Sequence, residues 1–109
     1  MTREEILEMI EEIGLPYAYY RFEEDTAQPT PFIVFFYGNN DGFFADNSNY
    51  ANVEVLNVEL YTETRDFEQE AAVEAVLDEY GFTYNKEPAY ISEERMWQIA
   101  YEMEVLING

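Results

Sequence analysis

The fold is decided by the stretch MWQIAYEMEVLI, residues 96–107, which alternates between an apolar set and a mixed set of side chains. Trp97, Ile99 and Tyr101 begin the apolar set, which continues with every second residue to the end of the stretch. Helical spacing would scatter these residues around an axis, whereas a strand gathers them on one face. The stretch therefore predicts a long strand with one face in the core.

Six further segments complete the predicted fold around this strand. Two amphipathic helices are expected, and the first begins with a capping box formed by Thr2 and Glu5. The strand interrupted by Pro88 is expected at an edge or a bulge, because proline cannot donate a hydrogen bond to a neighbouring strand. The expected segments are helix 2–13, strands 17–22, 32–37 and 53–62, helix 66–80, and strands 82–91 and 96–107.

The order α-β-β-β-α-β-β predicts an α+β fold, a single domain over residues 1–109 with one mixed or mainly antiparallel sheet. Each helix must bury an apolar stripe, so both helices are expected on one face of the sheet. The opposite face then carries Glu59, Glu102, Glu104 and several aromatics, which favours contact with another subunit. The stripe of the second helix is Val73, Val76, Leu77 and Tyr80, extended back to Phe67 and Ala72. The buried core is expected to include Val58, Leu60, Leu77, Ile99 and Tyr101.

Composition narrows the classes of function. The 109 residues include 24 acidic and 5 basic ones, a formal net charge of −19 at pH 7. Nucleic acids and anionic membranes require basic surfaces, so this balance argues against binding either. The chain has no cysteine and no histidine, which removes the commonest nucleophile, base and metal ligands. We therefore expect no enzymatic activity, no cofactor and no resident metal. The acidic, amphipathic start also predicts no signal peptide.

A turn-rich segment, residues 38–52, carries three aromatic side chains among glycines and asparagines. These aromatics either cap the core or bind a partner, since a solvated loop does not need them. The interface hypothesis selects Phe43, Phe44, Asp46 and Tyr50. Asp41 and Asp46 with loop carbonyls are a weaker alternative, a low-affinity calcium site that lacks the spacing of an EF-hand.

Several short motifs resemble those of small proteins from the tail modules of tailed phages and prophages. The resemblance covers residues 32–106 and is closest to tail terminator, or tail completion, proteins. Trp97 stands where another aromatic, usually tyrosine, is expected in that family. The motifs are Phe43-Phe44-Ala45-Asp46-Asn47 with Tyr50, Glu59-Leu60-Tyr61-Thr62-Glu63, Arg65-Asp66 with Glu70, Tyr90-Ile91, Glu94, and Met96-Trp97-Gln98 with Tyr101-Glu102.

The resemblance implies a virion structural protein, assembled in the bacterial cytoplasm, that forms a homo-oligomeric ring, commonly a hexamer. Such a ring sits at the head-proximal end of the tail tube and contacts the tail tube protein and the head connector. DNA would pass through without specific binding, and an acidic lumen would repel its phosphates. The resemblance implies no catalytic residue and no membrane contact.

A protein of another class also fits the charge. An acidic DNA mimic occupies the DNA groove of a host enzyme with carboxylates spaced like phosphates. Here many carboxylates lie on the exposed side of the first expected helix, such as Glu4, Glu8 and Glu11, which is ordinary amphipathy. The sequence therefore favours the tail protein and keeps the DNA mimic as the alternative.

Overall fold

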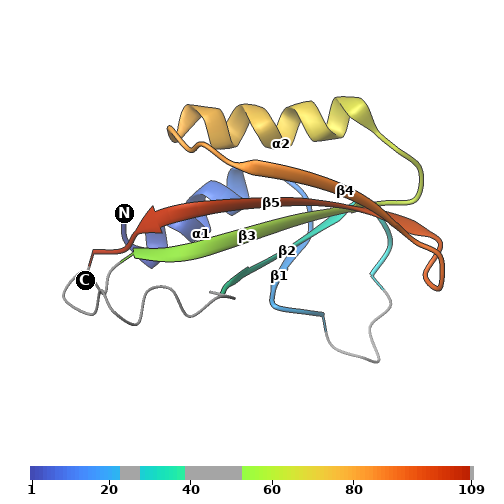
Figure 1. Cartoon of the computed structure of the whole chain (residues 1–109), viewed down its shortest axis with the longest axis horizontal. Coiled ribbons are helices and arrows are strands. Elements are labelled where there is room, and N and C mark those ends of the chain that lie inside the picture. The colour runs from blue at the N-terminus through green and yellow to red at the C-terminus, as the bar shows by residue number, and fades with distance from the viewer. Residues whose placement is uncertain (23–27, 39–52, 109) are drawn as a thin grey trace.

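The computed structural model describes residues 1–22, 28–38 and 53–108 and has the predicted α+β order (Figure 1). Two strands, at 32–37 and 53–62, have the predicted bounds. The elements are α1 (Arg3–Glu12), β1 (Tyr17–Tyr19), β2 (Phe32–Tyr37), β3 (Val53–Thr62), α2 (Phe67–Glu79), β4 (Asn85–Ile91) and β5 (Met96–Leu106).

The five strands form one mixed sheet in the order β1-β2-β3-β5-β4. β1 runs parallel to β2, and each of the other neighbouring pairs is antiparallel. The long strands β3 and β5 pair near the centre, where Val58 lies opposite Tyr101. β4 lies at an edge of the sheet, as Pro88 predicted.

Both helices cover the same face of the sheet (Figure 1). Thr2 and Glu5 form the predicted capping box at the start of α1, and the Asp66 side chain accepts a hydrogen bond from the Gln69 N–H at the start of α2. The core lies between the helices and the sheet. Its fully buried members include Ile6, Met9 and Ile10 of α1 and the predicted residues Val58, Leu60, Leu77, Ile99 and Tyr101.

Three expected strands are shorter than predicted: β5 by one residue, and β1 and β4 by more, each of these two for a local reason. β1 ends at Tyr19, because Tyr20 turns the chain out of the sheet with a φ of 72°. β4 begins at Asn85 rather than residue 82. Phe82 instead closes the end of α2, where its N–H donates to the Leu77 carbonyl after Gly81 adopts a φ of 83°.

The predicted stripe of α2 is wrong at its first turn. Phe67 is 67% exposed, and Ala72 is exposed as well. Glu70 occupies the buried position there and is 1% exposed. Arg65 pairs with that carboxylate and also lies over the Phe67 ring, 4.6 Å from its centroid. An ion pair therefore takes the place that the sequence pattern assigned to apolar side chains.

Candidate functional site

The residues predicted for an interface, Phe43, Phe44, Asp46 and Tyr50, all lie in the segment 39–52, outside the described residues. The candidate site described here comes from the other part of the prediction, the sheet face opposite the helices.

That face has no helix over it in the described ranges of the chain (Figure 1). We call it the aromatic–acidic face. The strand register places every second residue of the four longer strands on it. Its members are Phe32, Val34 and Phe36 of β2, Val53, Val55, Asn57, Glu59 and Tyr61 of β3, Met96, Gln98, Ala100, Glu102, Glu104 and Leu106 of β5, and Asn85, Glu87, Ala89 and Ile91 of β4.

The β2 side of this face is aromatic. The rings of Phe32 and Tyr61 stack with their centroids 4.9 Å apart. Phe22 meets Phe32 edge-on at 5.2 Å, and Tyr20 meets Phe36 edge-on at 5.9 Å. Because neighbouring rings shield it, Phe32 is only 9% exposed. The face therefore presents a packed aromatic surface rather than isolated rings.

Tyr20 has an unusual backbone conformation, which brings its own ring and that of Phe22 against the rings of β2. Its φ of 72° is uncommon for a residue with a side chain. The Arg21 N–H donates to the Tyr19 carbonyl at 2.8 Å, which closes a γ-turn around Tyr20. Such strain costs about 1–3 kcal/mol and concentrates at functional sites. The turn is thus an independent reason to regard this face as functional.

A hollow of ≈ 600 Å³ opens beside the aromatic rings. Phe22, Phe32 and Tyr61 line one part of it, and Ile91 and Met96, next to the β4–β5 turn, line another. Protein pockets that bury small ligands have volumes of about 300–1,000 Å³. The hollow is therefore large enough to take one or two apolar side chains of a partner.

Glu59 lies in the middle of the face and is half-buried. The Tyr61 hydroxyl donates to Glu59 Oε1 at 2.8 Å, and Gln98 Nε2 donates to the Tyr61 hydroxyl at 2.7 Å. Burial raises the pKa of Glu59 above its ordinary value, and the hydrogen bond from Tyr61 lowers it only in part. No lysine or arginine among the described residues forms an ion pair with Glu59.

Two more carboxylates lie beside Glu59 around a small residue. Ala100 is opposite Glu59 on β3 and opposite Glu87 on β4, and Glu102 follows two positions along β5. Opposite residues on neighbouring strands have Cβ atoms about 4.5–5.5 Å apart. The strand positions of this face hold four glutamates and no lysine or arginine. The β3–β5–β4 side is therefore acidic, with the small residue Ala100 at its centre.

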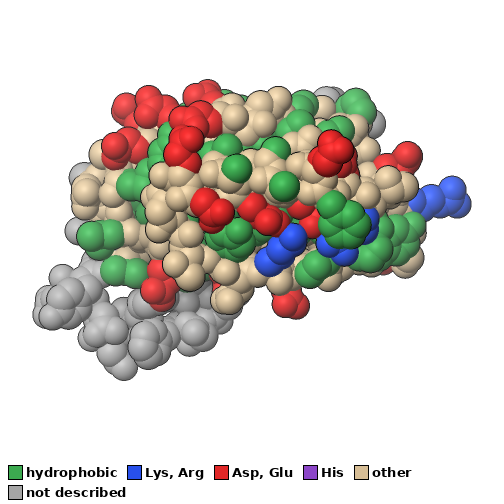
Figure 2. Space-filling view, turned by 90° about the horizontal axis from the view of Figure 1, so that it is seen from above, with side chains coloured by type: hydrophobic (Ala, Val, Ile, Leu, Met, Phe, Trp, Pro, Cys, Tyr) green, Lys and Arg blue, Asp and Glu red, His purple; other side chains and the backbone are tan. Residues whose placement is uncertain are grey.

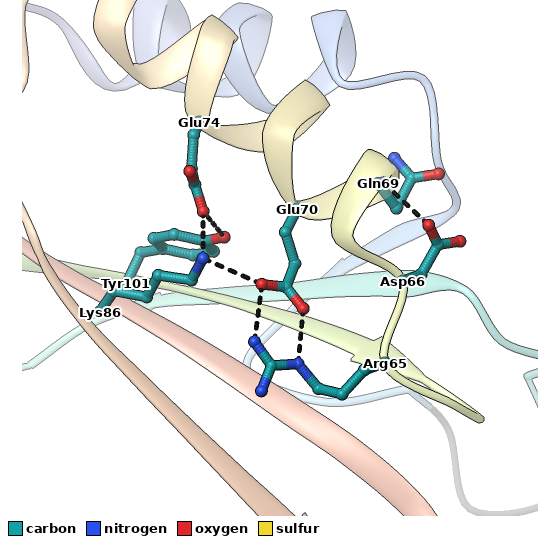
Figure 3. A network of polar contacts seen from close by, with 7 residues as sticks. All are labelled: Arg65, Asp66, Gln69, Glu70, Glu74, Lys86 and Tyr101. Atoms are coloured by element: carbon teal, nitrogen blue, oxygen red, sulfur yellow. Dashed lines mark hydrogen bonds and ion pairs between the residues drawn. The ribbon is translucent and has the colours of Figure 1, made fainter.

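The ion pairs of the described residues lie elsewhere. Arg3 pairs with Glu54, and Arg65 and Lys86 converge on Glu70 beneath α2 (Figure 3). Arg65 donates to both oxygens of Glu70, at 2.8 and 3.0 Å, and Lys86 Nζ lies 2.9 Å from Glu70 Oε1. The cations of this network are thus on the helix-bearing side of the sheet, away from Glu59.

The network continues through a second carboxylate of α2. Lys86 Nζ lies 2.6 Å from Glu74 Oε2, which also accepts a hydrogen bond from the Tyr101 hydroxyl at 2.7 Å (Figure 3). Burial alone would raise the pKa of Glu70, but the hydrogen bonds from Arg65 and Lys86 outweigh it and hold the pKa below its ordinary value. Every charge here has a partner, so the network anchors α2 to β4 and β5.

The helix-bearing side differs from the aromatic–acidic face in its charges. Seen from above, it shows separate groups of carboxylates, with lysine and arginine beside hydrophobic side chains (Figure 2). Arg65 also lies 5.2 Å from the centroid of the Trp97 ring, and Trp97 meets Tyr90 edge-on at 5.4 Å. On the other side of the sheet, at the aromatic–acidic face, the charged residues Arg21 and Glu94 also line the hollow.

The described residues contain no group of three or more side chains placed to hold a metal ion. Among the helices described, none is long and apolar enough to cross a membrane. The arrangement can bury apolar area and attract cations, which is the chemistry of a protein-binding surface.

Sequence reasoning found part of this site and missed part. Alternation along β3 and β5 predicted Glu59, Glu102 and Glu104 on the uncovered face, and the structure confirms all three. Glu87 was missed because Pro88 obscured the alternation of its strand. The hollow was missed because its lining comes from separate segments, and no spacing signal joins Phe22 to the β4–β5 turn.

Comparisons with protein-family models, curated proteins and solved structures found no match.

Proposed function

We propose that this protein is a structural subunit of a phage or prophage tail, similar in role to a tail terminator. In this proposal copies of the chain form a ring, as in the family that the sequence resembles, at the head-proximal end of the tail tube. The ring ends tube growth and contacts the tube protein and the head connector. Its role is to bind other proteins, without catalysis.

The aromatic–acidic face carries this proposal. It combines packed rings, a hollow of ≈ 600 Å³ and a half-buried carboxylate that has no ion-pair partner among the described residues. Phe32 and Val34 are buried, whereas Tyr20 is 65% exposed and Phe36 and Tyr61 are partly exposed. Apolar side chains gathered at one surface often mark a binding role. A chain with this face and a core on the other side of the sheet is suited to assembly.

The residues behind the resemblance support the same view, because several of them contact one another. Tyr61 accepts a hydrogen bond from Gln98, and Tyr90 packs against Trp97. Arg65 forms a two-point ion pair with Glu70, as the previous section describes. These contacts join α2, β3, β4 and β5. Motifs of this kind preserve a scaffold, which fits a structural role.

The test is deletion of the gene in the phage or prophage that encodes it, followed by electron microscopy of the particles. Without a terminator, we expect tail tubes of uncontrolled length that are not joined to heads. A plasmid copy of the wild-type gene should restore tails of uniform length joined to heads. Normal tails in the deletion strain would overturn the proposal. A normal tail together with renewed sensitivity of the phage to a host DNA-binding enzyme would favour the DNA mimic.

A further inference from the structure

The carboxylates at the centre of the aromatic–acidic face form no ion pair with a lysine or arginine among the described residues. Glu59 is half-buried, and its only described side-chain partner is the Tyr61 hydroxyl. A partly desolvated carboxylate is stabilised most by a cation at close range. Glu87 and Glu102 lie beside Glu59 around the small residue Ala100 and bring no positive charge. The cation must come from outside this face.

A second copy of this chain, placed face to face, cannot supply it. A two-fold contact through this face would set the same glutamates against one another, with no lysine or arginine at the strand positions to separate them. Like charges facing each other across an interface cost several kcal/mol. Each copy also carries a net charge of −19. A face-to-face contact between two copies is therefore disfavoured, and the occupant that fits the charge is a basic surface.

The aromatic side of the face adds a second requirement. Apolar and aromatic side chains, among them Phe22, Phe32 and Met96, make the larger part of the hollow's lining, and Arg21, Gln28 and Glu94 make the rest. Its occupant should therefore offer an apolar side chain. A small cation satisfies only the acidic side, and a lipid only the apolar side. A protein surface that carries lysine or arginine next to an exposed apolar residue satisfies both.

We infer that the aromatic–acidic face binds a basic surface of a different protein, which places a lysine or arginine against Glu59 and an apolar side chain in the hollow. The inference rests on the proposed function in one respect, since it takes this protein to be another tail component. It also assigns contacts between copies in a ring to surfaces other than this one.

A synthetic peptide tests the face directly. The probe is a short, capped peptide with two phenylalanines followed by four lysines, and the comparison peptide has glutamate in place of lysine. The peptides are titrated into isotope-labelled wild-type protein, and amide resonances are followed by NMR. We expect the lysine peptide to shift Gln98, Ala100 and Glu102, and the glutamate peptide to shift none of them.

Two double variants of equal charge separate this face from general attraction to an acidic protein. The test variant is Glu59→Gln with Glu102→Gln, and the control is Glu8→Gln with Glu79→Gln, whose carboxylates are exposed on the helices. We expect the test variant to weaken peptide binding about tenfold and the control to weaken it less than about twofold. Equal losses in both variants, or shifts spread over the helices, would overturn the inference.

Sedimentation velocity of the same proteins tests whether a second copy of this chain occupies the face. If a second copy occupied the face, the test variant would change the oligomeric state of the protein, and that result would overturn the inference. An unchanged oligomer together with weakened peptide binding supports it. The peptide experiment does not involve tails, so its failure leaves the gene-deletion result standing, and normal tails after deletion leave the peptide result standing.

Discussion

At the scale of single residues, the carboxylates of Glu59 and Glu70 differ in their burial, in their partners and in the direction in which the fold shifts their pKa values. Glu70 is almost completely buried and has Arg65 and Lys86 as partners. Glu59 is half-buried, and among the described residues its one side-chain partner is the Tyr61 hydroxyl. The pKa of Glu70 is therefore lowered and that of Glu59 raised. The first carboxylate stabilises the fold, and the second one opposes it.

Replacing Glu59 with glutamine should stabilise the isolated protein at neutral pH. Glutamine keeps an oxygen that can accept the hydrogen bond from Tyr61, and it removes a charge that burial disfavours. Because the folded-state pKa of Glu59 is raised, this gain is complete above that pKa and disappears as the pH falls below 4.5, where the unfolded state also binds the proton. Urea unfolding of the variant and the wild type at neutral pH and below pH 4.5 measures the difference. A variant less stable than the wild type at neutral pH would contradict this reasoning.

At the scale of elements, α2 is held to the strands by an ion network as well as by apolar packing. Arg65 follows β3, Glu70 and Glu74 belong to α2, and Lys86 belongs to β4. The network thus connects three consecutive elements beside the buried Tyr101 hydroxyl. Its loss would free the first turn of α2, whose own apolar residue, Phe67, faces solvent.

Glu70→Gln should lower the free energy of unfolding by about 3 kcal/mol, the lower end for breaking a buried ion pair, because Arg65 and Lys86 keep some solvent contact. The pKa of Glu70 is lowered in the fold, so its contribution is present above pH 4.5 and is lost as the pH falls through the folded value. Urea unfolding measures the loss, with the exposed neighbour Glu68→Gln as the control. A loss no larger than that of the control would show that the network is not structural.

The sequence predicted the helices and strands better than it predicted the turn at Tyr20 and the ion pairs between elements. Alternation is a local property, so the strands 32–37 and 53–62 and the face of Glu59 could be read directly. The γ-turn at Tyr20 could not, because tyrosine has no preference for positive φ and tertiary contacts impose it. Arg65 and Lys86 lie far apart in sequence, and no spacing rule brings them to one carboxylate.

At the scale of the whole molecule, charge is divided between the two sides of the sheet. The ion pairs of the described residues involve α1, α2 and the segments next to them, and none of them includes a glutamate of the aromatic–acidic face. With a net charge of −19 on 109 residues, repulsion among carboxylates opposes the compact state. Salt reduces repulsion over distances beyond about 8 Å at physiological ionic strength.

The melting temperature should therefore rise when salt is increased from low to moderate concentration. Screening weakens the repulsion between exposed carboxylates more than it weakens the buried pairs of Glu70. Differential scanning calorimetry at fixed pH measures the change, and a neutral osmolyte at equal osmolality controls for effects other than charge. A melting temperature that falls over this range would mean that the ion pairs outweigh the net repulsion.

The position of Trp97 makes its intrinsic fluorescence a local probe of the structure. It is the sole tryptophan, and it lies half-buried on the helix-bearing side between Arg65 and Tyr90. Indole emission therefore reports whether the start of α2 remains seated on β5. Ligands on the opposite side of the sheet reach tyrosine and phenylalanine rings instead. Selective excitation of the indole separates loosening of the helix layer from events at the aromatic–acidic face, so one unlabelled sample distinguishes unfolding from recognition.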